Sequence, residues 1–503
     1  MTNKKSNRVS GTANEAHASE ASRNAVKPHS SEVKPESKTE KKTEKKTESS
    51  PRKKLFGTDG IRGTANQFPI TPDVILRVGQ AMGLILMRAP ARNKVPKVVI
   101  GKDTRLSGYM VENALTSGLN SMGVHVELVG PLPTPGIGFL TRNMRADAGV
   151  VISASHNAYV DNGIKIFGPD GYKIPDAMER EIEELVATAD FTVSLAESPL
   201  IGRSKRIDDA DGRYIVHAKN AFPLEYTLEG LRIVLDCAHG AAYKVAPMIF
   251  RELGAECIVL GNQPNGFNVN DKSGALYPDR VAEAVLQYRA DVGIALDGDA
   301  DRVVMVDDSG QVVNGDHILA VCALHLKEQN QLPKDTVVAT QMSNFALDRL
   351  MQSHGIRVIR VDVGDKYVVE EMRKHGYSLG GEQSGHIIFH EHTTTGDGVI
   401  AALNVLAVMK SKSANLRSLN AILEDYPQVL VNTRVRRREN LSQIKGYREL
   451  IEKIEAQLRG EGRVFVRFSG TEPVVRVLLE GRDRGEISRY AEEIAGFLER
   501  ELS

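Results

Sequence analysis

Short apolar runs and amphipathic segments alternate along most of this chain, and the alternation restricts the fold more than any other feature. The apolar run 97–102 predicts a buried strand, and segment 111–123 has the spacing of a helix. The same order begins again near residue 231 and near residue 317. Because strands that alternate with helices form βαβ units, each round predicts an α/β domain with a mainly parallel sheet.

The 503 residues are too many for one hydrophobic core, so the sequence predicts several domains. We expect α/β domains at 52–200, 201–310 and 311–427, which resemble one another as an architectural repeat. A smaller α+β domain is expected at 428–503. The predicted fold class is therefore α/β, with three similar parallel or mixed sheets and one C-terminal α+β domain.

Residues 1–51 have a different composition. They contain no Leu, Ile, Phe, Tyr or Trp, and Lys38–Glu48 is a charged repeat, KTEKKTEKKTE. Such a segment cannot bury enough apolar area to offset the entropy lost on ordering, so we expect a disordered polar tail. Its acidic residues and the lack of an apolar stretch argue against a signal or transit peptide.

The overall charge excludes some functions. Lys plus Arg and Asp plus Glu both total 65, so no net field attracts nucleic acid or an acidic membrane. No apolar run approaches the ~20 residues of a membrane span, and Val399–Met409 is expected to be a core helix. The scattered Cys237, Cys257 and Cys322 favour reduced core residues in a cytoplasmic protein.

The strongest local signal is DGDADR, which contains Asp297, Asp299 and Asp301 between two apolar strands. Three carboxylates this close repel one another unless a cation lies among them, so the loop predicts a Mg²⁺ site. An EF-hand is excluded because Arg302 stands where its sharp-turn Gly belongs. A phosphatase that uses Asp297 as its nucleophile remains an alternative.

A second loop follows the apolar run Gly149–Ile152 and contains Ser155. A serine at the end of a strand is well placed for chemistry, because a rigid element fixes an exposed hydroxyl. His156 is a possible hydrogen-bond partner, and Lys165 offers a mobile cation nearby in the sequence. Taken alone, the stretch is equally typical of a simple turn.

Two further loops carry groups that bind sugar phosphates. RFSGTEP, at 467–473, combines small residues, hydroxyls and arginine into a candidate anion site, with Arg476 beyond it. GGEQSGH, at 380–386, offers a carboxylate and a hydroxyl that suit the vicinal hydroxyls of a sugar. Either loop in isolation is also compatible with an ordinary turn.

Five motifs together identify a resemblance. FGTDGIRG (Phe56–Gly63), predicted as a glycine-rich loop, GVVISASHNAYVDNGIK, DGDADR, GGEQSGH and RFSGTEPVVR occur in this order. The set resembles the α-D-phosphohexomutase superfamily from about Lys54 to the C-terminus. Ala158 and Phe468 depart from residues common in the family, but neither removes a proposed ligand. The resemblance implies four domains around a central cleft.

The resemblance also implies residue roles. Ser155 would carry the phosphoryl group, and Mg²⁺ would be bound by three aspartates and phospho-Ser155. Arg62, Lys165 and His386 would lie near the reacting groups, the last two with acid–base or charge-stabilising roles. The implied ligands are Asp297, Asp299 and Asp301 for the metal, Gly364, Glu382 and Ser384 for the sugar, and Arg467, Ser469, Gly470, Thr471 and Arg476 for the distal phosphate.

The implied activity converts glucosamine 6-phosphate into glucosamine 1-phosphate through a 1,6-bisphosphate, and supplies UDP-N-acetylglucosamine for the cell wall. The bisphosphate would act as primer or intermediate, and Ser155 would first be phosphorylated by a kinase or by autophosphorylation. The implied protein is a monomer or homodimer. Mannose or glucose phosphates are the alternative substrates, and a non-catalytic phosphosugar-binding protein is a third reading.

Overall fold

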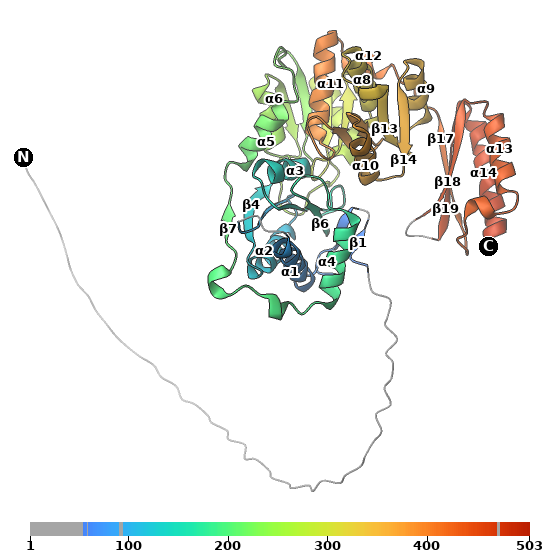
Figure 1. The fold of residues 1–503 in the computed structure, drawn as a ribbon. Coiled ribbons are helices and arrows are strands. Elements are labelled where there is room, and N and C mark those ends of the chain that lie inside the picture. The colour runs from blue at the N-terminus through green and yellow to red at the C-terminus, as the bar shows by residue number, and fades with distance from the viewer. Residues whose placement is uncertain (1–53, 58, 90–93, 470–472) are drawn as a thin grey trace, which may run out of the picture. The chain divides into compact units, whose positions relative to one another are not determined.

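The computed structural model describes residues 54–57, 59–89, 94–469 and 473–503, and their arrangement is shown in Figure 1. The tail predicted at 1–51 and the site residues Gly470 and Thr471 lie outside the described residues. Four sheets are present in the described part of the chain. Within that part, no helix is both long and apolar enough to cross a membrane.

Domain I contains a seven-stranded mixed sheet with the order β1-β2-β6-β5-β3-β4-β7. Its parallel strands are β3, β4, β5 and β7, whereas β6 runs antiparallel to both β5 and β2. Figure 1 shows α1 and α2 side by side against this sheet. The bounds are β1 Phe56–Gly57, β2 Gly60–Thr64, β3 Lys97–Lys102, β4 His125–Pro131, β5 Ala148–Ile152, β6 Asp161–Phe167, β7 Ser204–Arg206, α1 Pro72–Arg88, α2 Gly108–Ser121, α3 Thr134–Asn143 and α4 Asp176–Thr188.

The FGTDGIRG stretch is not the loop that the sequence predicts. Its second half is strand β2, and the fully buried Ile61 pairs with Ile164 of β6. Gly60 makes the turn possible: its φ is +78°, and a Cβ there would lie 2.2 Å from the carbonyl oxygen of Ile164. Glycine content therefore marks a tight approach to β6 rather than a lack of regular structure.

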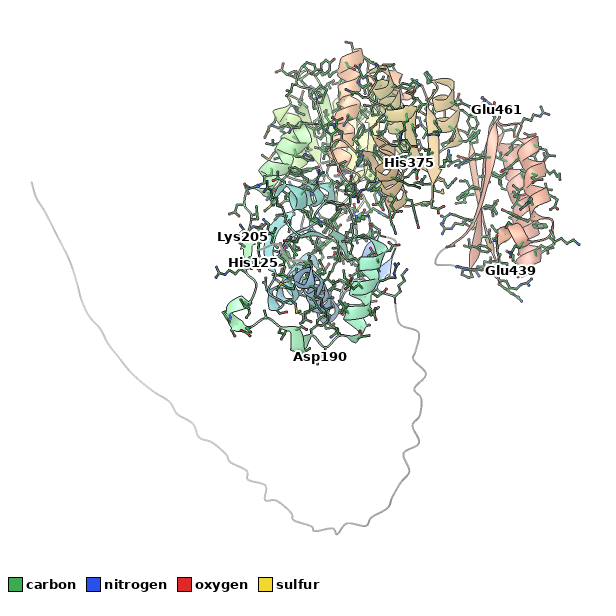
Figure 2. The ribbon with its side chains drawn as sticks, in the orientation of Figure 1. His125, Asp190, Lys205, His375, Glu439 and Glu461 are labelled. Carbon is green, nitrogen blue, oxygen red and sulfur yellow. The ribbon has the colours of Figure 1, made fainter. Side chains whose placement is uncertain are left out.

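Strand β7 lies beyond residue 200 and pairs with β4 of the first sheet. The backbone N–H of Arg203 donates to His125 Nδ1 at 3.1 Å, and Lys205 lies 3.4 Å from Glu127. His125 and Lys205 are accordingly close together at this edge in Figure 2. The polar segment near residue 200 is thus a sheet edge.

Domains II and III repeat the central strand order of domain I. The orders β11-β10-β8-β9 and β16-β15-β13-β14 correspond to β6-β5-β3-β4, each with one antiparallel strand beside three parallel ones. The bounds in domain II are α5 Ala210–Lys219, β8 Arg232–Asp236, α6 Val245–Glu252, β9 Glu256–Leu260, α7 Pro278–Tyr288, β10 Val292–Leu296, β11 Val303–Asp307 and β12 Val312–Val313. Those in domain III are α8 Gly315–Glu328, β13 Thr336–Thr340, α9 Phe345–Ser353, β14 Arg357–Val361, α10 Asp365–His375, β15 Leu379–Gly381, β16 Ile387–Phe389, α11 Gly398–Lys412 and α12 Leu416–Asn420.

Domains I to III share part of their core, and domain I has a second apolar cluster of its own. Buried residues of all three, including Leu132, Ile294 and Leu406, belong to one apolar cluster. Helix α11 is buried over most of its length, which confirms the predicted core helix. The three cysteines are free, with Cys237 and Cys322 buried.

Domain IV is an antiparallel sheet of order β17-β19-β18 with two helices. Its elements are β17 Gln428–Arg434, α13 Tyr447–Gln457, β18 Gly462–Phe468, β19 Val474–Gly481 and α14 Arg484–Leu502. Val475, Val477 and Leu479 alternate along β19 and pack with α14 in a separate apolar cluster. This α+β domain therefore has its own core.

Candidate active site

Ser155 lies in the connection between β5 and β6 and is buried. Its hydroxyl donates to Asp297 Oδ2 at 2.7 Å, and its Oγ lies 3.3 Å from His156 Nδ1. The serine has a φ of +51°, a left-handed conformation that is uncommon for a residue with a side chain. Surrounding contacts must therefore hold it.

Arg105 supplies most of that support. Its guanidinium is fully buried and pairs with Asp103 at 2.7 Å. The same group donates to the carbonyl oxygens of Ser155 and Asn157 at 2.8 Å each, to Asp161 O at 3.1 Å, and to Ala158 O. One buried cation thus fixes the backbone of the whole serine loop.

Domain II contributes a further donor to this loop. The side-chain amide of Asn270 donates to Ser155 O at 2.8 Å and to Asn157 O at 3.1 Å. Gly298 also approaches the loop, because a Cβ on it would lie 2.6 Å from Ser155 O. The serine and aspartate loops are therefore packed backbone to backbone.

The three aspartates form a metal-binding geometry. One oxygen from each of Asp297, Asp299 and Asp301 lies within 4.8 Å of the others, and all three residues are buried. The Oδ1 atoms of Asp299 and Asp301 are buried without a hydrogen-bond partner in the described structure. Buried carboxylate oxygens without partners suit an oxygen-ligated divalent cation, so the residues fit the implied metal.

Lys165 is the cation already present beside these carboxylates. Its Nζ lies 2.9 Å from Asp299 Oδ2 and 3.0 Å from Asp301 Oδ2, and its side chain is 1% exposed. Burial lowers the pKa of Lys165, but Asp299 and Asp301 outweigh this effect and raise it well above the usual value. The prediction of a mobile cation is therefore wrong: Lys165 is a fixed positive charge in β6.

The positive charge of Lys165 does not neutralise all three aspartates. Burial, together with Asp301 and Asp299, raises the pKa of Asp297 well above its usual range. Although burial opposes ionisation of Asp299, Lys165 and a hydrogen bond from Thr134 hold the pKa of that carboxyl below its ordinary value. An added divalent cation would favour the ionised form of all three.

The predicted sugar-binding loop of domain III contacts the strand that follows the aspartate loop. The N–H of Val303, in β11, donates to Gly385 O at 3.0 Å. Within the loop, Ser384 Oγ lies 3.5 Å from Glu382 Oε2, and the N–H of Gly364 donates to Glu382 Oε1 at 3.2 Å. The predicted residues Gly364, Glu382 and Ser384 are thus brought together.

His386 is buried at the end of this loop. Its Nε2 accepts the N–H of Gly396 at 3.2 Å, so we assign the proton of the neutral ring to Nδ1. Nδ1 is buried and has no partner among the described residues. Nδ1–H is therefore a buried donor without a partner in the described structure.

Arg62 lies in β2 and donates to Asp59. Burial, followed by the charges of Arg302 and Arg62, lowers the pKa of His156 to about 4. His156 is therefore neutral at physiological pH and remains a hydrogen-bonding partner of Ser155 rather than a cation.

The candidate phosphate residues lie in domain IV. Arg467 and Arg476 are directly opposite in the β18–β19 pair, and Ser469 follows β18 and is buried. Burial and the charge of Arg476 both lower the pKa of Arg467. The two guanidinium groups extend from opposite positions of one strand pair, and arginine binds phosphate oxygens in a bidentate manner, so their placement suits a phosphate.

Several residues of the site have no predicted role. Asp59 contacts Lys165 at 3.5 Å, Thr134 donates to Asp299 at 2.6 Å, and Asn270 holds the serine loop. Lys173 and Asp365 form an ion pair beside His386. Asp59 lies within the motif FGTDGIRG, but Asn270 and Thr134 carry no local signal that would have identified them.

The chain is similar to known proteins over most of its length. The four phosphoglucomutase/phosphomannomutase domain families match residues 53–193, 212–310, 314–429 and 430–497. The phosphoglucosamine mutase of Bdellovibrio bacteriovorus is 66% identical over 455 residues, which cover 90% of this chain and 99% of the relative. That of Myxococcus xanthus is 54% identical over 451 residues, covering 90% and 98%.

Solved structures show the same fold. A phosphoglucomutase/phosphomannomutase family protein from Burkholderia thailandensis aligns with a TM-score of 0.72 at 23% identity, over 87% of this chain and 95% of the other. The N-acetylphosphoglucosamine mutase of Aspergillus fumigatus aligns with a TM-score of 0.60 at 17% identity, over 89% and 96%. The chain therefore belongs to the phosphoglucomutase/phosphomannomutase family, the α-D-phosphohexomutases, and within it is similar to phosphoglucosamine mutases.

Proposed function

We propose that this chain is a phosphoglucosamine mutase that interconverts glucosamine 6-phosphate and glucosamine 1-phosphate, with Ser155 as the phosphoryl carrier. The observation that carries the proposal is the 2.7 Å contact between Ser155 Oγ and Asp297, inside a buried aspartate triad. The 66% identity to a phosphoglucosamine mutase supports this choice of sugar.

The three aspartates and an oxygen of phospho-Ser155 would hold Mg²⁺, which prefers oxygen ligands. When bound, the ion neutralises charge on the phosphoryl group during transfer. Lys165 supplies a second positive charge, and its pairing with two carboxylates favours a charge-stabilising role over that of a base. His386 contributes a donor at Nδ1.

Transfer needs the sugar to be held at both ends. Gly364, Glu382 and Ser384 would bind the sugar, and the arginines of domain IV the phosphate that does not react. The O–P bond at Ser155 would break as a bond to O1 of glucosamine 6-phosphate forms, and the O1 proton would pass to the serine oxygen, which gives the 1,6-bisphosphate and a free Ser155 hydroxyl. After the bisphosphate turns, its 6-phosphoryl group is transferred to Ser155, and the product, glucosamine 1-phosphate, leaves the enzyme. The proposed distal ligands are Arg467, Ser469, Gly470, Thr471 and Arg476.

The product would be used to make UDP-N-acetylglucosamine, a precursor of the cell wall. We propose that the enzyme acts in the cytoplasm. The same bisphosphate would prime an unphosphorylated enzyme, and a kinase or autophosphorylation is the alternative route to phospho-Ser155. We further propose a monomer or homodimer that acts without nucleic acid or membrane.

The test is kcat/KM for glucosamine 6-phosphate, mannose 1-phosphate and glucose 1-phosphate, with Mg²⁺ and the matching bisphosphate. We expect a preference for glucosamine of about 100-fold, which corresponds to ~2.7 kcal/mol. Equal or higher activity on mannose or glucose would instead identify a phosphomannomutase or phosphoglucomutase.

Ser155→Ala and Asp297→Asn separate the mutase from a phosphatase. We expect label from radioactive sugar bisphosphate on the wild-type enzyme at Ser155 and none on Ser155→Ala, which is also inactive. Turnover that survives in Ser155→Ala but not in Asp297→Asn would support an aspartate nucleophile and contradict the proposal. Ser309→Ala, in a domain II turn, is a control serine.

A further inference from the structure

A short segment of domain I that follows β6 contacts helix α10 of domain III through several charged and polar pairs. α10 begins at Asp365, immediately after the candidate sugar ligand Gly364. The segment thus connects the strand that carries Lys165 with the helix that starts at the sugar-binding site. The pairs across this boundary are Lys173–Asp365, Asp176–Lys366, Asp170–Arg373 and Tyr172–His390.

Lys173 is the most buried cation of this boundary. Its side chain is 21% exposed, whereas Lys366 and Arg373 are 29% and 47% exposed. Its Nζ lies 2.5 Å from Asp365 Oδ2 and also contacts Asp59 Oδ1. One ammonium therefore bridges a carboxylate of domain I and a carboxylate of domain III.

Each of the two carboxylates in turn touches groups of the candidate active site. Asp59 contacts Arg62 and lies 3.5 Å from Lys165. Asp365 Oδ2 lies 3.7 Å from His386 Nε2. A continuous chain of charged side chains therefore runs from the aspartate triad in domain II, through domain I, to Asp365 at the start of α10 in domain III.

We propose that Lys173 is a positioning residue that holds the sugar-binding residues of domain III at a fixed distance from Ser155, and so retains the bisphosphate while it turns. The proposal rests on the proposed function. Without the Lys173 ammonium, the carboxylates of Asp59 and Asp365 would face each other across the domain boundary. These two negative charges would repel each other, because they are partly buried and poorly screened by water. The sugar loop would then move away from the serine loop, and the intermediate would escape more often.

The test measures how much sugar bisphosphate is released per completed turnover, and how strongly turnover depends on added bisphosphate. We expect Lys173→Met and Asp365→Asn each to raise release by about ten-fold, a size typical of coupled ion pairs. The double variant should release no more than the worse single variant, because both changes break the same bridge. Lys173→Arg, which keeps the charge, should stay within about three-fold of wild type.

Lys366→Met is the matched control. Lys366 also joins α10 to domain I, through Asp176, but this pair is more exposed and Asp176 contacts no candidate ligand. Equal release from Lys366→Met and Lys173→Met would overturn the proposal, because any lost surface pair would then have the same effect. Additive effects in the double variant would also overturn it, since Lys173 would then act independently of Asp365.

The outcome does not depend on the identity of the sugar. If wild type prefers mannose 1-phosphate, the proposed substrate is wrong, and the release assay is repeated with that sugar. A wild-type level of release in Lys173→Met would then refute only the role of Lys173. Urea unfolding of each variant shows whether a change in release reflects lost folding instead.

Discussion

Arg105→Lys tests whether the buried guanidinium positions Ser155, the proposed nucleophile. The Arg105 side chain makes five hydrogen bonds, one to Asp103 and four to carbonyl oxygens of the serine loop. A lysine keeps the positive charge opposite Asp103 but has only three N–H donors on one nitrogen atom. At least two of the five bonds must therefore be lost.

The expected loss follows from that count. A hydrogen bond that involves a charged group contributes about 1.5 kcal/mol or more, so two lost bonds remove about 3 kcal/mol. If this energy holds Ser155 in its left-handed conformation beside Asp297, kcat/KM falls by about 150-fold. Phosphorylation of Ser155 by the sugar bisphosphate should slow by a similar factor, because it uses the same serine geometry.

The assay is kcat/KM with urea unfolding measured in parallel. Arg77→Lys is the control: Arg77 of α1 donates to the carbonyl oxygens of Val186 and Ala189 in domain I, away from the serine loop. We expect Arg77→Lys to lower stability with kcat/KM changed by less than about three-fold. Wild-type kcat/KM in Arg105→Lys would refute the reasoning, as would equal losses of activity in both variants.

Three other predictions concern the metal, a buried carboxyl and domain IV. Mg²⁺ should raise the thermal midpoint of wild type, and Asp299→Asn should reduce that increase, as measured by calorimetry. Burial raises the pKa of Asp397 to about 7, although the hydrogen bonds that its carboxylate accepts from the α11 N-terminus and Tyr214 act to lower the pKa. Because the unfolded pKa is about 3.9, the folded state binds more protons between these values, so stability falls as pH rises from about 4 to 7. Asp397→Asn keeps an acceptor for the helix and should remove this slope, measured by urea unfolding at about pH 5 and about pH 8. Glu480 is buried against Arg463, so Glu480→Gln should destabilise domain IV by about 3 kcal/mol, as its urea transition would show.

Much of the fold follows from the sequence because its signals are local. The apolar run 97–102 is the parallel strand β3, and the helix predicted over 111–123 overlaps α2, Gly108–Ser121. Asp297 and Ser155 were recognisable because each belongs to a short contiguous motif. The contact between them joins residues 142 positions apart and was implied only by the family resemblance.

The remaining features depend on tertiary contacts. Strand β2 was predicted as a loop because its glycines have low strand propensity, and its pairing with β1 and β6 stabilises it there. Lys173 and Asn270 are single residues whose partners lie in other domains. No periodicity or motif marks such residues, so their roles require the structure.

The shared strand order explains where support is needed in the site. In each α/β domain the functional loop connects a parallel strand to its antiparallel neighbour, and the register fixes its ends at Ile152↔Ile164, Leu296↔Val303 and Gly381↔Ile387. The intervening segments are 153–163, 297–302 and 382–386, which contain 11, 6 and 5 residues. The serine loop is the longest, so strand pairing alone constrains it least. This length accounts for the buried guanidinium and the domain II amide on its carbonyl groups, because Ser155, the proposed nucleophile, has a left-handed conformation on the longest loop and needs donors from outside the hairpin.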